Sequence, residues 1–121
     1  MTALQGIDTV IVRVSDIGRA KQWYQEKLGL TPVWEDTKQQ LVVLDTGSPT
    51  SLTLWQTDKK ATIDRELASY PIFRTTDAKL SWQVLRDKGA DVGDLIRDDH
   101  TTYFRCYDPD GNVLEACQVH E

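Results

Sequence analysis

Apolar and polar side chains alternate along two stretches of the chain, from Ile7 to Asp16 and from Tyr70 to Asp77. Alternation with a period of two predicts a β-strand in each stretch. Each stretch ends at an aspartate, a residue type that caps the first turn of a helix. A shift of 61 positions superposes the two stretches and brings equivalent residues together: Thr9 with Tyr70, Ile11 with Ile72, Arg13 with Arg74, and Asp16 with Asp77.

A segment with apolar residues at helical spacing follows each aspartate. The pattern predicts helices over Asp16–Leu28 and Asp77–Lys88. Gly29 and Gly89 stand where a helix commonly ends with a left-handed residue.

Three further strands are predicted after each helix, separated by turn-forming residues such as those of Asp108–Gly111. The polar link 58–68 between the two halves contains enough apolar spacing for one helical turn, Ile63–Leu67. The repeated order of elements predicts an α+β domain over residues 5–119, built from two tandem βαβββ modules, 6–57 and 69–119, that form a curved mixed sheet around a cleft. The expected strands are Leu30–Glu35, Gln40–Asp45 and Ser51–Thr57 in the first half, and Val92–Arg97, Thr101–Tyr107 and Asn112–Val119 in the second.

Composition narrows the class of protein. The 121 residues are 40% hydrophobic and carry a net charge of −5, which disfavours a nucleic-acid surface because phosphate binding needs a basic face. Cys106 and Cys117 lie in apolar runs and are expected to be free thiols. The first residues lack a basic segment followed by an apolar one, so we expect no signal peptide, no membrane span and a cytoplasmic location.

Strand alternation also predicts which side chains face the cleft. The valines of the first strand should meet the helix, as should Leu52, Leu54 and Leu114. The opposite faces then carry arginines, one carboxylate and flat aromatic surfaces, the mixture typical of a small-molecule site. The predicted ligand-binding residues are Thr9, Arg13, Thr53, Trp55, Arg74, Tyr103 and Arg105, with Glu115 and Tyr70 as candidate catalytic residues.

Two interpretations of these charged residues remain open. Arginine pairs can clamp a carboxylate or phosphate in two-point geometry. Alternatively, Arg13, Arg74 and Glu115 pair with one another and have a purely structural role, since a buried carboxylate needs such partners. Trp55 and Tyr70 can equally fill the core.

Three local patterns resemble the vicinal oxygen chelate superfamily, which includes glyoxalase I, bleomycin-resistance proteins, fosfomycin-resistance proteins and extradiol dioxygenases. They are Val10–Asp16 leading into the helix that ends Trp23-Tyr24 … Leu28-Gly29-Leu30, the segment Phe73–Asp77, and the hairpin Asp108–Glu115. The resemblance covers about Gly6 to Val119 and implies the two-module fold. It does not imply one activity, because this scaffold hosts many chemistries.

The resemblance also implies where a metal would bind. Metal enzymes of the superfamily take ligands from four strand positions, which here are Thr9, Thr53, Tyr70 and Glu115. Only Glu115 is a good ligand for a divalent metal. Gln56 is a possible substitute, but alternation points it toward the core, and His100 and His120 fall outside these positions. We therefore expect no metal and no other cofactor.

The resemblance implies three candidate functions. The first is metal-free binding of a small anionic or aromatic molecule, as in the bleomycin-resistance branch, usually by a homodimer. The second is a glyoxalase-type lyase, a transferase or a dioxygenase with an atypical metal set or metal-free acid–base chemistry. In that case Glu115 would be the base, Tyr70 the acid and Arg74 the oxyanion donor. The third is an interaction module whose cleft is closed by arginine–glutamate pairs.

Overall fold

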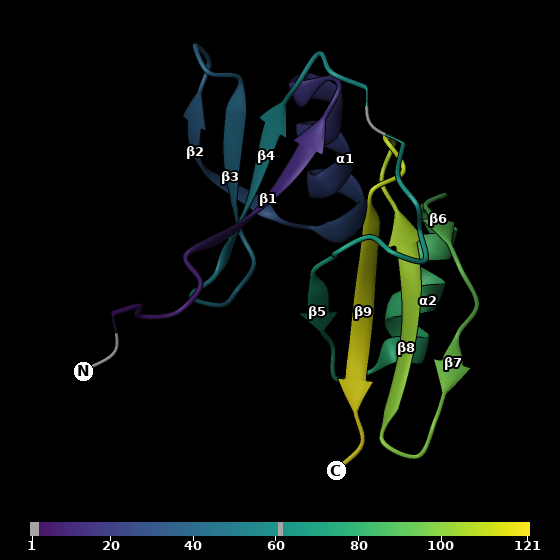
Figure 1. The fold of residues 1–121 in the computed structure, drawn as a ribbon. Coiled ribbons are helices and arrows are strands. Elements are labelled where there is room, and N and C mark those ends of the chain that lie inside the picture. Colours follow the sequence, from purple (N-terminus) through teal and green to yellow (C-terminus); the bar gives the residue numbers. More distant parts are fainter. Residues whose placement is uncertain (1–2, 61) are drawn as a thin grey trace. The chain divides into compact units, whose positions relative to one another are not determined.

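The computed structural model describes residues 3–60 and 62–121, which form two compact units that meet in sequence at Lys60 and Ala61. The first unit is a βαβββ arrangement, and the second has the same order with the strand after its helix divided in two. Each unit has its own mixed sheet, so the predicted α+β class and two-module fold are confirmed (Figure 1). The first unit contains one helix and a sheet with strand order β1-β4-β3-β2. Its elements are β1 (Thr9–Val14), α1 (Ile17–Leu28), β2 (Thr31–Asp36), β3 (Leu41–Asp45) and β4 (Ser51–Gln56).

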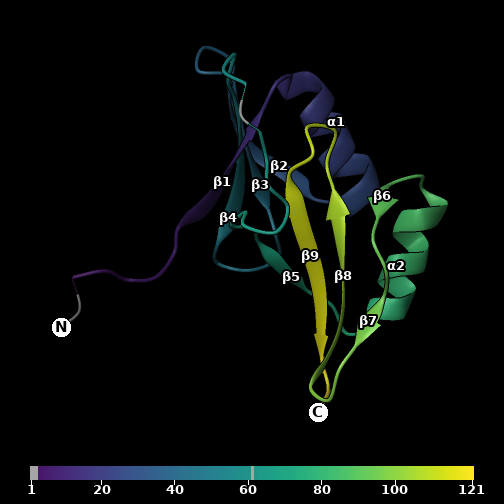
Figure 2. The ribbon, with the colours of Figure 1, turned by 45° about the vertical axis from the view of Figure 1, so that its right-hand side comes forward.

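The second unit repeats this plan with strand order β5-β9-β8-β6, and β7 also pairs with β8. The long β8 and β9 strands lie side by side in an antiparallel ladder (Figure 2). Neither α1 nor the helix of this unit is long and apolar enough to cross a membrane within the part of the chain that the structure describes. The elements are β5 (Ile72–Arg74), α2 (Ala78–Asp87), β6 (Asp91–Val92), β7 (Ile96–Arg97), β8 (Thr101–Tyr107) and β9 (Val113–Val119).

The sequence repeat is also a repeat of strand register. In the first unit, β1 runs parallel to β4, and Ile11 lies opposite Thr53. In the second, β5 runs parallel to β9, and Ile72 lies opposite Glu115. Ile11 and Ile72 correspond under the shift of 61 positions that aligns the first strands, and Thr53 and Glu115 correspond under a shift of 62, so the two units have equivalent strand pairing and are copies of one supersecondary structure.

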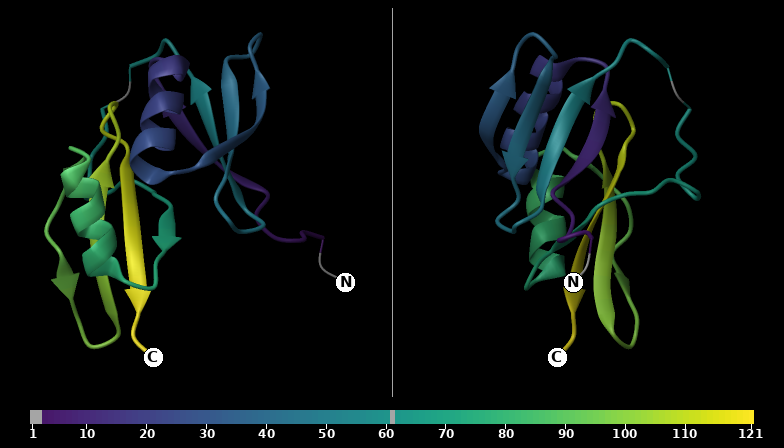
Figure 3. Two further views of the ribbon diagram at one scale, coloured as in Figure 1. Left: turned by 180° about the vertical axis from the view of Figure 1, so that it is seen from behind. Right: turned by 60° about the vertical axis from the view of Figure 1, so that its left-hand side comes forward.

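Each helix covers one face of its own sheet, and strand alternation assigns the faces as predicted (Figure 3). Leu52 and Leu54 are fully buried on the helix side in the first unit, and Phe104 and Leu114 take the same place in the second. The two cysteines are free and lie on opposite faces of the β8–β9 ladder, with Cys106 on the buried side. Burial, with the nearby carboxylates of Asp108 and Asp91, raises the pKa of the Cys106 thiol to about 12, so this thiol is inert at neutral pH.

Both helix N-termini are capped twice, once locally and once from the sheet. Asp16 accepts a hydrogen bond from the Arg19 amide, and Asp77 accepts one from the Leu80 amide, each at 3.0 Å. The last helix-side residue of the neighbouring strand supplies the second cap. The Gln56 side-chain oxygen accepts from the Ile17 amide, and the Gln118 side-chain oxygen accepts from the Ala78 amide, both at 2.9 Å.

Replacing Gln118 with alanine is expected to lower the free energy of unfolding by about 1 kcal/mol, because a half-buried helix amide would lose its acceptor. Urea unfolding would measure the change. Gln83→Ala is the matched control. Gln83 is exposed on the same helix and its side chain donates to a neighbouring exposed side chain, Asp87, so its loss should cost less than about 0.5 kcal/mol. Equal costs for the two variants would contradict the capping role.

The predicted continuous strand Val92–Arg97 is wrong. Residues 92–97 do not form a continuous strand but divide into β6 and β7, which pair with different parts of β8. The break falls at Gly93–Leu95, where the Gly93 carbonyl turns to accept a hydrogen bond from the Trp82 indole at 2.9 Å. The Gly93 amide still donates to the Arg105 carbonyl of β8 at 2.8 Å, so Gly93 remains bonded to β8 through its amide while its carbonyl satisfies a half-buried donor on α2.

The segment that precedes β5 is part of the second unit rather than a free link. The Leu67 and Ala68 amides both donate to the Asp64 carbonyl, at 3.1 and 2.8 Å, so the expected helical turn is present over residues 65–67. Ala61, also within the predicted linker, lies outside the described residues.

Candidate functional site

A guanidinium group organises the face of the second sheet that α2 leaves uncovered. Arg105 lies in the middle of β8 and points away from the helix, because its neighbours Phe104 and Cys106 are buried on the helix side. Its Nη2 donates to the Tyr70 hydroxyl at 2.8 Å and its Nη1 donates to the Arg65 carbonyl at 3.2 Å. Two of its donor groups are therefore used to hold the segment before β5 against the sheet.

Glu115 lies directly opposite Arg105 on β9. Its side chain is only 9% exposed, and its Oε1 is 3.7 Å from the Arg105 Nε. Charge-assisted hydrogen bonds are about 2.7–2.9 Å long, so this ion pair is loose. Burial raises the pKa of the Glu115 carboxyl, and the positive charge of Arg105 opposes the rise without cancelling it.

Apolar surface adjoins this network. Ile72 lies opposite Glu115 on the other side of β9 and is 57% exposed. Tyr103 is half-buried, one step along the same face, opposite Cys117. The sheet therefore offers a buried carboxylate with a flat aromatic ring and an aliphatic side chain close by, and this combination can bind a small molecule.

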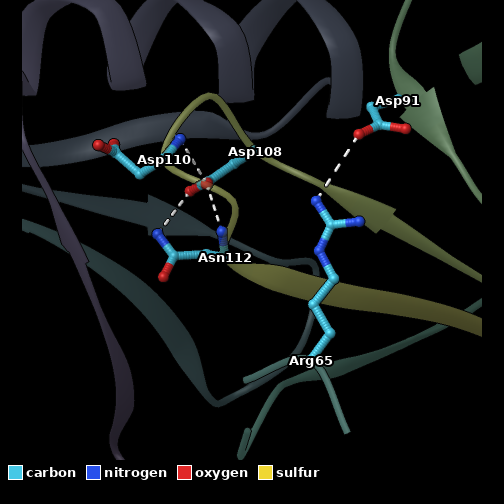
Figure 4. A network of polar contacts seen from close by, with 5 residues as sticks. All are labelled: Arg65, Asp91, Asp108, Asp110 and Asn112. Atoms are coloured by element: carbon cyan, nitrogen blue, oxygen red, sulfur yellow. Dashed lines mark hydrogen bonds and ion pairs between the residues drawn. The ribbon is translucent and has the colours of Figure 1, made fainter. Parts of the chain in front are cut away.

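Arg65 fixes the other end of the tethered segment. Its guanidinium carbon lies 3.6 Å from the centre of the Tyr107 ring, a short cation–π contact, and its Nη2 is 3.9 Å from the Asp91 carboxylate. Figure 4 shows this ion pair beside the turn that joins β8 to β9. Arg65 and Arg105 together dock residues 65–70 on the open face of the sheet.

The turn itself is organised by a buried carboxylate. Asp108 is 6% exposed and accepts hydrogen bonds from the Asp110 amide at 3.0 Å and from both the amide and the side-chain nitrogen of Asn112 at 2.8 Å (Figure 4). These bonds set the register of the β8–β9 ladder, and that register places Arg105 opposite Glu115.

The raised pKa of Glu115 predicts a pH dependence of stability. A carboxyl whose pKa is higher in the folded than in the unfolded protein stabilises the fold below the unfolded value, here taken as 4.5, and this contribution is lost as the pH rises through the folded value. Relative to a Glu115→Gln variant, the wild type should therefore lose unfolding free energy between about pH 4 and about pH 7.

Urea unfolding of both proteins at the two pH values would check this sign. Glu26→Gln, which alters an exposed glutamate on α1, is the control and should show no such trend. A wild type that gains stability over Glu115→Gln as the pH rises would show that the Arg105 attraction outweighs burial.

The open face of the first unit has hydroxyls where the second has ionisable groups. The Thr9 and Thr53 hydroxyls are 2.7 Å apart and share a hydrogen bond, and Thr9 also donates to the Ser51 carbonyl at 3.1 Å. Farther along, the Arg13 guanidinium carbon lies 5.3 Å from the centre of the Trp55 ring, and its Nε donates to the Trp55 carbonyl at 3.2 Å. The Trp55 indole donates to the Gln39 carbonyl, so its ring is fixed.

Within their own units, the nine predicted site residues therefore fall into recognisable groups. Tyr70, Arg105 and Glu115 form one network, with Tyr103 beside it. Thr9 bonds Thr53, and Arg13 lies over Trp55. Arg74 is separate: it is two residues along β5 from Ile72 and lines a surface cavity of about 680 Å³ with Arg97 and His120.

The four superfamily metal positions do not fit a divalent metal ion. In the first unit, Thr9 and Thr53 offer neutral hydroxyls that bond each other. In the second, the Tyr70 phenol accepts from Arg105, and only Glu115 is a carboxylate. Divalent catalytic metals are held by imidazole, thiolate or several carboxylates. Among residues 3–60 and 62–121, no three His, Cys, Asp or Glu side chains are grouped to hold such an ion.

Two parts of this arrangement were not predicted from the sequence. The Arg65 contacts require the polar segment before β5 to dock on the sheet, and no pattern in that segment indicates this. The helix cap by Gln118 could have been found, because Gln56 and Gln118 occupy equivalent positions at the ends of the repeated strands.

Together, the duplicated units and their sheets, each covered by a helix on one face, define the class of small two-module α+β proteins. A family model described as Glyoxalase/Bleomycin resistance protein/Dioxygenase superfamily matches residues 6–116. The chain belongs to this superfamily, as the sequence resemblance predicted.

Solved structures share the fold at low sequence identity. An antibiotic-binding protein, TnmS3 from Streptomyces sp. CB03234, is 23% identical with a TM-score of 0.78, over 99% of this chain and 100% of that one. A glyoxalase family protein from Enterococcus faecalis is 20% identical with a TM-score of 0.80, over 97% and 100% of the two chains. No curated protein matches the chain.

Proposed function

We propose that this protein binds a small aromatic or anionic molecule without a metal ion, on the open sheet faces. The observation that carries the proposal is the network on β8 and β9, where a buried carboxylate and an oriented phenol lie beside exposed apolar side chains. TnmS3, which has the same fold, is an antibiotic-binding protein. The poor donor set at the four metal positions supports binding by stacking and hydrogen bonding instead.

A thermal-shift screen of aromatic and anionic compounds, with chelator present, tests this function. We expect at least one class to raise the melting temperature, because a ligand that binds only the folded state stabilises it. Tyr103→Ala should weaken that shift, since the exposed part of its ring adjoins the network, and Trp34→Ala, an exposed aromatic on β2, is the control. No stabilisation by any compound would contradict a binding function.

The expected setting is a cytoplasmic homodimer. In that setting, both subunits would present equivalent sheet faces to their ligands. Light scattering after gel filtration would test the oligomeric state independently of the ligand.

Acid–base catalysis is the second candidate function. The raised pKa of Glu115 favours this function, because a carboxyl with a pKa nearer to neutrality is a more effective general base. The Tyr70 phenol, the candidate acid, is hydrogen-bonded to the same Arg105 guanidinium that faces Glu115. Product analysis of the compounds that stabilise the protein would distinguish the two functions. Conversion that is lost in Glu115→Gln would establish catalysis, and unchanged compounds would establish binding alone.

A further inference from the structure

In the network of Tyr70, Arg105 and Glu115, the donors and acceptors that are not used within the protein indicate which polar groups a ligand needs. The guanidinium of Arg105 is largely used inside the protein: Nη1 and Nη2 each donate a hydrogen bond, to Arg65 and Tyr70, and Nε faces Glu115. Arg105 is therefore a positioning residue: three of its five N–H groups face partners within the protein, which leaves a ligand one N–H on each Nη rather than a free guanidinium.

The Tyr70 hydroxyl has an O–H donor that its bond to Arg105 does not use. Arginine carries only N–H donors, so the Tyr70 oxygen must be the acceptor in its bond to Arg105. Its own O–H proton then points away from Arg105. Among the described residues no acceptor is bonded to that proton. The phenol is therefore ready to donate one hydrogen bond to a ligand oxygen or nitrogen.

The Glu115 carboxylate oxygens can accept further hydrogen bonds. Its side chain is more than nine-tenths buried, and its nearest described cation, at 3.7 Å, is too far for a short charge-assisted bond. This long contact with Arg105 lowers the pKa of the Glu115 carboxyl without cancelling the effect of burial, and it involves only one of the two carboxylate oxygens. A buried carboxylate in this state gains from a hydrogen-bond donor and is destabilised by a second negative charge.

We infer that the ligand of this site is an uncharged planar molecule that carries an O–H or N–H donor for Glu115 and an adjacent acceptor for Tyr70, rather than an anion. The inference deepens the proposed function and rests on it. Lactams have this pairing, because their N–H and C=O point outward from one edge of the ring and cannot bond each other. Tyr103 and the exposed side chain of Ile72 supply the surface against which the flat ring packs.

Three probes with the same naphthalene ring and different single substituents test the inference by isothermal titration calorimetry at neutral pH. Naphthol has a donor, methoxynaphthalene lacks it, and naphthoate replaces it with a negative charge. We expect naphthol to bind the wild type at least about tenfold more tightly than either of the others, because only naphthol satisfies the buried carboxylate.

Two conservative variants show which side chain causes the preference for naphthol. Glu115→Gln keeps the shape but removes the charge, so it should bind naphthoate more tightly than the wild type does and narrow the preference for naphthol. Tyr70→Phe should weaken binding of quinolinone, a bicyclic lactam with an N–H donor and an adjacent carbonyl, while leaving the binding of naphthol nearly unchanged. Glu26→Gln is the control for a change of net charge, because that glutamate is exposed on α1.

The possible outcomes distinguish the inferred ligand class from the proposed binding function. Tightest binding of naphthoate, or a preference for naphthol that persists unchanged in Glu115→Gln, would overturn the inference while leaving the binding function intact. No binding of any probe would count against the binding function itself. Melting temperatures of both variants, measured alongside, show whether a lost preference reflects unfolding.

Discussion

Replacing Asp108 with alanine is expected to lower the free energy of unfolding by about 3 kcal/mol. Asp108 is almost fully buried in the β8–β9 turn and accepts three hydrogen bonds from Asp110 and Asn112. Bonds to an ionised group contribute more than neutral ones, and their loss leaves part-buried amides without an acceptor. Urea denaturation monitored by circular dichroism would measure the loss.

Asp64→Ala provides the matched control for this prediction. Asp64 also accepts a hydrogen bond from an amide two residues ahead, that of Glu66, but it is exposed to solvent. Its replacement should cost less than about 1 kcal/mol, because water can replace the lost acceptor. Similar costs for the two aspartates would mean that burial at the turn contributes little. Asp108→Asn, which retains one oxygen, should fall between them.

Arg105→Met is the second change with a large expected effect, a loss of about 2 kcal/mol of unfolding free energy at neutral pH. Methionine keeps much of the apolar stem but removes the bonds to the Tyr70 hydroxyl and the Arg65 carbonyl, and it leaves Glu115 without its cation. The expected loss of unfolding free energy is no larger because the Arg105 side chain is 34% exposed, so solvent screens part of its charge.

A double-mutant cycle separates the charge effect from the hydrogen bonds. In a Glu115→Gln background, Arg105→Met should cost less, because no carboxylate remains to be left unpaired. Arg97→Met, on exposed strand β7, is the control and should cost less than about 0.5 kcal/mol. An identical cost of Arg105→Met in both backgrounds would show that the ion pair with Glu115 has no energetic weight.

Strand faces were predictable from the sequence because alternation is a local property. Val12 and Val14 point to the helix and Ile11 away from it, as the pattern of the first strand requires. The duplicated aspartate caps were predictable for the same reason: Asp16 and Asp77 each bond an amide three residues ahead. These features depend only on neighbours within a few positions.

The partners of the charged side chains were not predictable in the same way. Sequence alone left Arg13, Arg74 and Glu115 as possible partners of one another. In the second unit Glu115 instead pairs with Arg105, because the β8–β9 register sets them opposite each other. Tyr70 and Arg65 join that network only because the segment before β5 docks on the sheet, which depends on tertiary contacts that no local pattern records.

Metal independence is the claim on which the binding function depends most, and one measurement tests it directly. The affinity of the best ligand from the screen should be determined for protein treated with chelator, and again after addition of Zn²⁺, Mn²⁺ or Ni²⁺. The chemistry of Thr9, Thr53, Tyr70 and Glu115 predicts the same dissociation constant in every case. Binding that disappears with chelator and returns with one of these ions would contradict the account.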